Sequence, residues 1–296
     1  MTIYPIAKIN LGLNVVECRP DGYHNIETVF LPVLLNDELR VETMPHAITP
    51  SESTNANGTC RLSVSFARPE DKWQGRAEDN LVVKAYDLLA AHYDLPPLHL
   101  RLRKQIPSQA GMGGGSADAA YTIRLINDYC RLGLIKEEMH HLAASIGADC
   151  AFFINPRPAY ATGIGDKLNC INDTQDKPYA SNPLGQLRDK YLALVKPDVA
   201  VSTKEAYAGI TPQRPTVNCL DALAQPIEEW RHTLVNDFEA SIFPKLPVLA
   251  QVKQSLYDDG ALYAAMSGSG STIFAIFNQR PNLTKYARYY NKVIAL

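Results

Sequence analysis

The sequence predicts an α+β protein, and three stretches of its 296 residues carry this prediction. Residues 7–15 alternate between apolar and polar side chains, which is the period of a strand. Residues 98–103 alternate in the same way and lead through a glycine-rich segment into a pattern of helical spacing. Residues 263–277 predict a strand, a glycine-serine loop and a second strand. Strands and helices mix without a regular strand–helix–strand repeat, which favours α+β over a doubly wound α/β fold.

The N-terminal strand places Lys8, Asn10 and Asn14 on one face and apolar residues on the other. We expect such a polar face either to be exposed to solvent or to line a polar cleft. The Arg-Pro-Asp-Gly turn signal at residues 19–22 separates this strand from the next strand-like stretch, residues 29–31.

The remaining elements follow from the same rules of period and capping. In chain order they are a strand at 62–66, a helix from residue 81 capped by Asp79 or Asn80, a helix at 136–146 stopped by Gly147, a strand at 191–195, a short helix after a capping box that begins at Ser202, and helices near 219–230, 246–258 and 282–292. Residues 171–190 are polar and predict a loop. We expect two domains, 1–155 and 156–296.

The composition limits the kinds of partner that the protein can bind. A formal net charge of −2 argues against a nucleic-acid ligand, and the apolar runs are too short for a membrane span. The first residues enter a strand pattern without a signal or transit peptide, so we expect a cytoplasmic protein. Its six cysteines are scattered without a Cys-x-x-Cys pair, which favours free thiols over a zinc site.

The glycine-rich segment, Ile106 to Ala120, is the most informative part of the chain. Glycines at a strand-to-helix junction let backbone N–H groups turn toward a ligand, and a helix N-terminus adds a partial positive charge. This pattern favours a phosphate cradle over a flexible turn. It is not a Walker A motif or a complete Gly-x-Gly-x-x-Gly, and no protein-kinase motifs occur.

Five segments in order resemble a known family. Residues 7–13, 107–120 and 266–271 are similar to the three motifs of the GHMP small-molecule kinases. Residues 19–24 and 147–153 narrow the resemblance to members that act on 4-diphosphocytidyl-2-C-methyl-D-erythritol. The resemblance implies an N-terminal domain like ribosomal protein S5 domain 2, a ferredoxin-like C-terminal domain and an active site in the cleft between them. It also implies transfer of the γ-phosphoryl group of ATP, with Mg²⁺, to the substrate's 2-hydroxyl group.

The resemblance also implies roles for single residues. Asp149 would be the catalytic base, and Lys8 would hold it ionised and stabilise developing negative charge. The expected ATP-phosphate residues are Pro107, Gly111, Gly113, Gly114, Gly115 and Ser116. The expected substrate residues are Asn10, Tyr23, His24, Thr203 and Tyr207. Ser116 either caps its helix or contacts the magnesium ion, and the sequence leaves both open.

Simpler interpretations stand beside these roles. Without the resemblance, Asp149 could equally be a helix cap or turn residue, and Lys8 could be an ordinary solvated surface lysine. Asp118 could be a first-turn partner of the helix dipole. A kinase for mevalonate, homoserine or galactose is a competing function, which the Tyr23–His24 pair and Tyr207 oppose because those alcohols carry no base. A mevalonate-pathway decarboxylase and a non-catalytic nucleotide-binding protein are further alternatives. The oligomeric state, a homodimer included, is left open.

Overall fold

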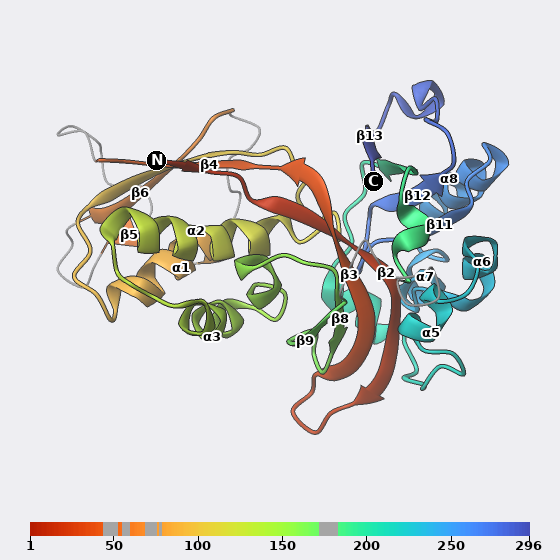
Figure 1. The fold of residues 1–296 in the computed structure, drawn as a ribbon, viewed down its shortest axis with the longest axis horizontal. Helices are drawn as coiled ribbons and strands as arrows, with labels where there is room; N and C mark the ends of the chain where they lie inside the picture. Colours follow the sequence, from red (N-terminus) through yellow and green to blue (C-terminus); the bar gives the residue numbers. More distant parts are fainter. Residues whose placement is uncertain (44–52, 55–59, 69–75, 77–78, 172–182) are drawn as a thin grey trace. The chain divides into compact units, whose positions relative to one another are not determined.

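The computed structural model describes residues 1–43, 53–54, 60–68, 76, 79–171 and 183–296 (Figure 1). These residues belong to two compact units that interleave along the chain. The first unit comprises residues 1–7, 35–108 and 113–156, and the second comprises residues 8–34, 109–112 and 157–296. The two predicted domains, 1–155 and 156–296, stay a prediction, because the compact units interleave along the chain and do not test these bounds.

The first unit is built on a five-stranded sheet in the order β1-β4-β7-β6-β5. Its strands are β1 (Thr2–Ile3), β4 (Glu38–Thr43), β5 (Ser53–Thr54), β6 (Cys60–Phe66) and β7 (Leu98–Arg103). β6 and β7 are parallel, and the other pairs are antiparallel. The leucines of β7 are buried and alternate with exposed or half-buried residues, as the sequence predicts for a half-buried strand.

Helices cover one face of this sheet. α1 (Leu81–Ala90) and α2 (Gly114–Cys130) contact its strands and lie side by side in Figure 1. α3 (Lys136–Ile146) and the short 3-10 helix η3 (Ala151–Ile154) pack on these helices. The predicted Asn80 cap of α1 is confirmed, because its Oδ1 accepts a hydrogen bond of 2.9 Å from the backbone N–H of Val82. α3 ends at Ile146 as predicted, with Gly147 in an extended conformation.

The second unit contains a four-stranded sheet in the order β2-β3-β8-β9. Its strands are β2 (Ile6–Cys18), β3 (His24–Asn36), β8 (Ala159–Thr162) and β9 (Lys167–Cys170). Figure 1 draws β2 and β3 as two long arrows joined by the predicted turn. Both faces of β2 are buried over most of its length. Of the two alternatives given for its polar face, exposure to solvent was therefore wrong, and the polar face lies inside the protein.

A second four-stranded sheet of this unit has the order β11-β12-β10-β13. Its strands, all paired antiparallel, are β10 (Tyr191–Lys196), β11 (Tyr263–Met266), β12 (Ile273–Phe277) and β13 (Tyr290–Ala295). This is the strand order of a ferredoxin-like sheet, as the resemblance implied. Between β10 and β11 run five α-helices: α4 (Thr203–Ala208), α5 (Cys219–Leu223), α6 (Trp230–Thr233), α7 (Phe238–Ile242) and α8 (Pro247–Asp258). A buried apolar cluster packs α4, α7 and α8 on the sheet.

Several predictions of local structure were wrong. The helix expected near 282–292 is the 3-10 helix η7 (Thr284–Tyr286) followed by strand β13, because β10 pairs with β13 along its free edge. The helix expected near 219–230 is broken into α5 and the 3-10 helix η6 (Ile227–Glu229). Ser202 precedes α4, but its side chain makes no capping hydrogen bond. Residues 172–182 of the loop predicted at 171–190 lie outside the described residues.

No helix in the described part of the chain combines the length and apolar character needed to cross a bilayer.

Candidate active site

Helix α2 of the first unit begins directly after the glycine-rich segment. Its N-cap is Gly113, which adopts the left-handed conformation and has no side chain with which to cap the first turn. The uncapped N–H groups and the helix dipole both favour an anion at this end. The predicted order of strand, glycine loop and helix is confirmed. The phosphate contacts of Pro107, Gly111, Gly113, Gly114, Gly115 and Ser116 stay a prediction.

Ser116 lies inside the first turn of α2, since the helix begins at Gly114. The alternative that Ser116 caps this helix was therefore wrong. Burial raises the pKa of the neighbouring Cys150 thiol to about 12, against the effect of a hydrogen bond with Ser116, which lowers it. A thiol so held in its protonated form is a poor nucleophile. Within the described ranges, no group of three or more His, Cys, Asp or Glu side chains is placed to hold a metal ion.

A buried ion cluster adjoins the start of α2. The ammonium of Lys104 contacts carboxylate oxygens of Asp37 and of Asp118, the latter at 2.6 Å. Burial raises the pKa of Asp118 to about 7, although the charge of Lys104 lowers it. The carboxyl groups in turn hold the pKa of Lys104 above its ordinary value, against burial, which lowers it. Asp118 is thus an ion-pair partner, and its expected role as a first-turn partner of the helix dipole was wrong.

The same cluster fixes the segment that enters the glycine loop. Asp37 Oδ1 accepts hydrogen bonds from the backbone N–H groups of Gln105, at 2.5 Å, and Ile106, at 2.9 Å. A Cβ at Gly114 would lie 2.9 Å from the Ile106 side chain, so the helix start packs closely on this segment. The backbone before the loop and the first residues of α2 are therefore tied together inside the first unit.

Asp149 lies in the turn between α3 and η3 and is half-buried. A half-buried residue is consistent with the expected catalytic base, which must be reachable by a substrate. Lys8 belongs to the second unit. The pairing of Lys8 with Asp149 stays a prediction.

Lys8 and Asn10 are brought together on β2 of the second unit. Lys8 Nζ donates a hydrogen bond of 2.5 Å to Asn10 Oδ1, and their side chains are almost fully buried. The Lys8 ammonium also lies 4.8 Å from the centre of the Phe30 ring. A lysine kept inside the protein by a polar partner and an aromatic face is no ordinary surface lysine.

The middle of the glycine-rich segment packs against the loop between β11 and β12. The backbone N–H groups of Ser271 and Thr272 donate to the carbonyl groups of Gln109 and Ala110, both at 3.3 Å. Ser267 Oγ donates to the Gly111 carbonyl at 2.9 Å. The two glycine-rich motifs at 107–120 and 266–271 therefore meet through residues 109–111.

Three aromatic groups of the second unit gather near the start of β3. The His24 and Tyr207 rings are stacked, with centroids 4.7 Å apart, and Phe238 meets Tyr207 edge-on at 4.8 Å. Tyr23 is 61% exposed, so its ring is free to receive a planar ligand. Thr203 Oγ1 lies 3.3 Å from Ser269 Oγ, on the loop that carries the C-terminal motif. The structure thus brings His24 together with Tyr207, and Thr203 with the serine-glycine loop.

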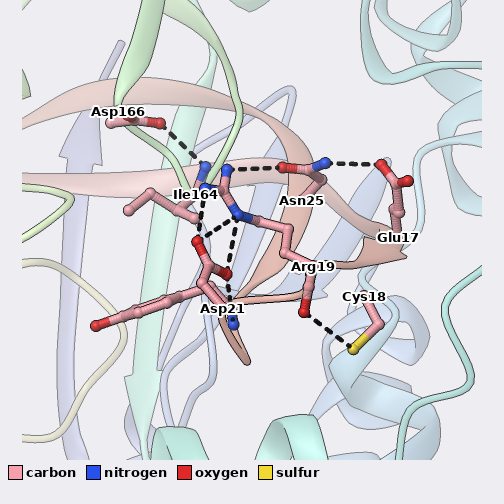
Figure 2. A network of polar contacts seen from close by, with 8 residues as sticks. Glu17, Cys18, Arg19, Asp21, Asn25, Ile164 and Asp166 are labelled. Carbon is pink, nitrogen blue, oxygen red and sulfur yellow. Dashed lines mark hydrogen bonds and ion pairs between the residues drawn. The ribbon is translucent and has the colours of Figure 1, made fainter.

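A polar network shapes the turn that precedes Tyr23 (Figure 2). Arg19 forms an ion pair with Asp21 at 2.7 Å and donates to Asn25, which donates to Glu17. Asp21 also accepts a hydrogen bond of 3.1 Å from the backbone N–H of Tyr23. The hydrogen bonds from Arg19 hold the pKa of the Asp21 carboxyl below its ordinary value. The network therefore fixes the backbone from which the Tyr23 ring projects.

Asp37, Lys104 and Thr28 contribute to the site without any motif in the sequence that marks them. Asp37 and Lys104 are separated by 67 positions, and no local pattern marks them as partners. Thr28 lies in a strand where a threonine is ordinary, and its two hydrogen bonds appear only when β2 and β3 are side by side.

Two family models match the chain. They are described as the GHMP kinases N-terminal domain, over residues 80–156, and the GHMP kinases C-terminal domain, over residues 217–293. The 4-diphosphocytidyl-2-C-methyl-D-erythritol kinase of Parabacteroides distasonis is 45% identical over 94% of this chain and 92% of its own length. The protein of the same description from Bacteroides thetaiotaomicron is 44% identical over 96% of this chain and 94% of its own.

Solved structures agree with these relatives. A crystal structure of 4-(cytidine 5'-diphospho)-2C-methyl-D-erythritol kinase is similar with a TM-score of 0.71 and 27% identity, over 99% of this chain and 98% of that one. The Methanococcus jannaschii mevalonate kinase, at a TM-score of 0.64 and 11% identity over 100% of this chain and 98% of that one, shares the fold. The chain therefore belongs to the GHMP kinase family and, within it, to the 4-diphosphocytidyl-2-C-methyl-D-erythritol kinases.

Proposed function

We propose that this enzyme transfers the γ-phosphoryl group of ATP to the 2-hydroxyl group of 4-diphosphocytidyl-2-C-methyl-D-erythritol. The choice of substrate rests on the aromatic residues of the second unit: His24 stacks on Tyr207, and Tyr23, which precedes His24 in the chain, has an exposed ring. A base gains stacking area from such rings, and the imidazole offers a hydrogen-bonding edge. An acceptor alcohol without a base gains nothing from them.

We further propose that Asp149 accepts the proton of the 2-hydroxyl group. The freed oxygen attacks the γ-phosphorus, the bond from that phosphorus to the bridging β,γ-oxygen breaks, and ADP leaves with the electron pair. Lys8 offsets negative charge that develops on the transferred phosphoryl group. Asn10, which already holds the Lys8 ammonium, would contact the acceptor end of the substrate, and Thr203 its cytidine end.

The nucleotide would enter as its magnesium complex. The backbone N–H groups at the start of α2 suit phosphate oxygens. Because no described cluster of acidic and imidazole side chains is placed to hold a metal, the ATP phosphates themselves would supply most of the ligands, and Ser116 one contact. Magnesium is commonly bound in this way, through phosphates, water and few protein groups. Use of ATP also fits a cytoplasmic location, and a homodimer stays a prediction for sedimentation measurements.

The test is an ADP-release assay with Mg-ATP and four acceptors: the cytidine substrate, mevalonate, homoserine and galactose. We expect turnover with the cytidine substrate alone. Turnover with another alcohol would refute the role of the aromatic group and leave the kinase chemistry standing. Absence of turnover with all four would favour a nucleotide-binding protein without catalysis.

A further inference from the structure

Thr28 is a fully buried polar residue that the proposed mechanism does not use. It lies on β3, and its relative exposure is 0%. Its hydroxyl group takes part in two hydrogen bonds, one with a backbone carbonyl group and one with a side-chain amide. A buried hydroxyl group that donates to one partner must act as the acceptor for the other. It therefore fixes the orientation of a side-chain amide that bonds to it.

The direction of each hydrogen bond follows from the chemistry of the first acceptor. The Gly12 carbonyl group is only an acceptor, so the Thr28 hydroxyl donates to it, at 2.5 Å. Thr28 Oγ1 is then left as an acceptor for Asn10 Nδ2, at 3.0 Å. The amide group of Asn10 is thereby oriented with its Oδ1 toward the Lys8 ammonium, at 2.5 Å. A flipped amide would direct an NH₂ group at the ammonium and lose both bonds.

Gly12 can supply this carbonyl because of its backbone conformation. It has a φ of +67° within strand β2, which L-residues with a Cβ rarely adopt. A Cβ at this position would lie 2.7 Å from Leu234 and 2.8 Å from the Cys219 thiol. The left-handed residue departs from regular strand geometry, and its carbonyl oxygen accepts from a side chain of β3.

The other contacts of Asn10 and Lys8 are made by backbone groups. The Asn10 N–H donates to Ser267 Oγ at 3.3 Å, and the Lys8 N–H donates to the Met112 carbonyl at 3.1 Å. These backbone bonds fix the strand but do not determine which way the side-chain amide of Asn10 faces. Its amide orientation is set by the Thr28 hydroxyl, which accepts from Nδ2, together with the Lys8 ammonium, which donates to Oδ1.

We propose that Thr28 is a positioning residue, which orients the Asn10 amide so that it holds the Lys8 ammonium in place for phosphoryl transfer. The inference rests on the proposed function, because Lys8 matters for catalysis only if the reaction is the one given above. Thr28 itself touches neither substrate in this account and acts through Asn10.

The experiment compares Thr28→Val, which keeps the shape and removes the hydroxyl, with Thr28→Ser, which keeps the hydroxyl. Thr122→Val is the matched control: Thr122 is also 0% exposed, and its hydroxyl bonds within α2 to the Asp118 carbonyl. We expect Thr28→Val to lower kcat by about 10-fold or more, with the KM for ATP nearly unchanged. Thr28→Ser restores kcat, and Thr122→Val lowers only stability.

A double-mutant cycle separates positioning from a structural effect. Because Thr28 acts through Asn10, Thr28→Val in an Asn10→Ala background should add little to the loss of kcat that Asn10→Ala causes alone. Multiplicative losses, or a Thr28→Val enzyme with normal kcat, would overturn the proposal.

A second readout does not depend on activity. The side-chain amide protons of Asn10, assigned in ¹⁵N NMR spectra with Asn10→Ala, should exchange slowly in the native protein and at least several-fold faster in Thr28→Val. Equal exchange in the two proteins would refute the orienting role. If the native enzyme turns over none of the four acceptors, the proposed function fails, while the exchange measurement still decides whether Thr28 orients Asn10.

Discussion

Substituting Gly111 by alanine isolates the contact between the two glycine-rich motifs. Gly111 has a φ of +70°, and a Cβ built on it would overlap the carbonyl oxygen of Ser267 and lie 2.8 Å from the carbonyl carbon. The obstacle is the backbone of Ser267, whose exposure is 0%, so no side-chain rotation relieves it. Residues 109–111 must therefore separate from the loop between β11 and β12.

The magnitude follows from what that separation breaks. Three hydrogen bonds join residues 109–111 to Ser267, Ser271 and Thr272, and each is worth about 1 kcal/mol. The left-handed backbone costs alanine a further 1–2 kcal/mol or so. The free energy of unfolding should thus fall by about 4–5 kcal/mol, a large share of an ordinary domain's stability.

Gly260→Ala is the matched control in the same unit. Gly260 has a φ of +92°, but a Cβ there meets nothing within 4 Å. Only the cost of the left-handed backbone remains, so the free energy of unfolding of this variant should fall by about 1–2 kcal/mol. Urea denaturation followed by circular dichroism measures both losses. If Gly111→Ala loses no more than Gly260→Ala, the close packing of the two motifs is not what requires glycine at position 111.

Three further predictions concern single residues. Lys104→Met leaves two buried carboxyl groups without their cation and should lower the free energy of unfolding by about 3–5 kcal/mol in the same denaturation assay. Its control, Lys285→Met, removes an exposed ion pair and should lower the free energy of unfolding by less than about 1 kcal/mol. Tyr207→Leu should raise the KM for the cytidine substrate about tenfold or more without changing the KM for ATP, and Tyr207→Phe should keep both values; equal effects on both KM values would contradict a base-stacking role. Asp149→Asn should lower kcat about 100-fold or more while calorimetry still detects binding of both substrates, and an unchanged kcat would exclude Asp149 as the base.

Elements with a strong local period could be predicted from the sequence. β7 alternates and α2 repeats at helical spacing, and the glycines between them mark the junction, so the bounds of β7 and the type of element on each side of the junction were predictable. The region 282–292 shows the limit of this reasoning. Its apolar residues fit a helical spacing, but the free edge of β10 needs a partner, and pairing with β13 overrides the local preference.

The residues of the candidate site also fall into a group that could be predicted from the sequence and a group that could not. Glycines, Tyr23, His24 and Asp149 stand in contiguous motifs and could be named from the sequence. The supporting residues could not, because their partners are remote: Thr28 finds Asn10 across two strands, and Lys104 finds Asp37 over 67 positions. A hydrogen bond between distant segments leaves no periodic trace in either of them.

The ion pair at the tip of the β2–β3 hairpin has a consequence for the medium in which the enzyme works. The side chains of Arg19 and Asp21 are 36% and 47% exposed, so dissolved ions reach both partners and weaken their attraction. The Lys104 cluster is shielded, with its lysine side chain only 14% exposed. Rising ionic strength should therefore loosen the backbone under Tyr23 before it disturbs the start of α2. At high salt the support of the Tyr23 backbone would then weaken, while the ion cluster that holds the start of α2 stays intact.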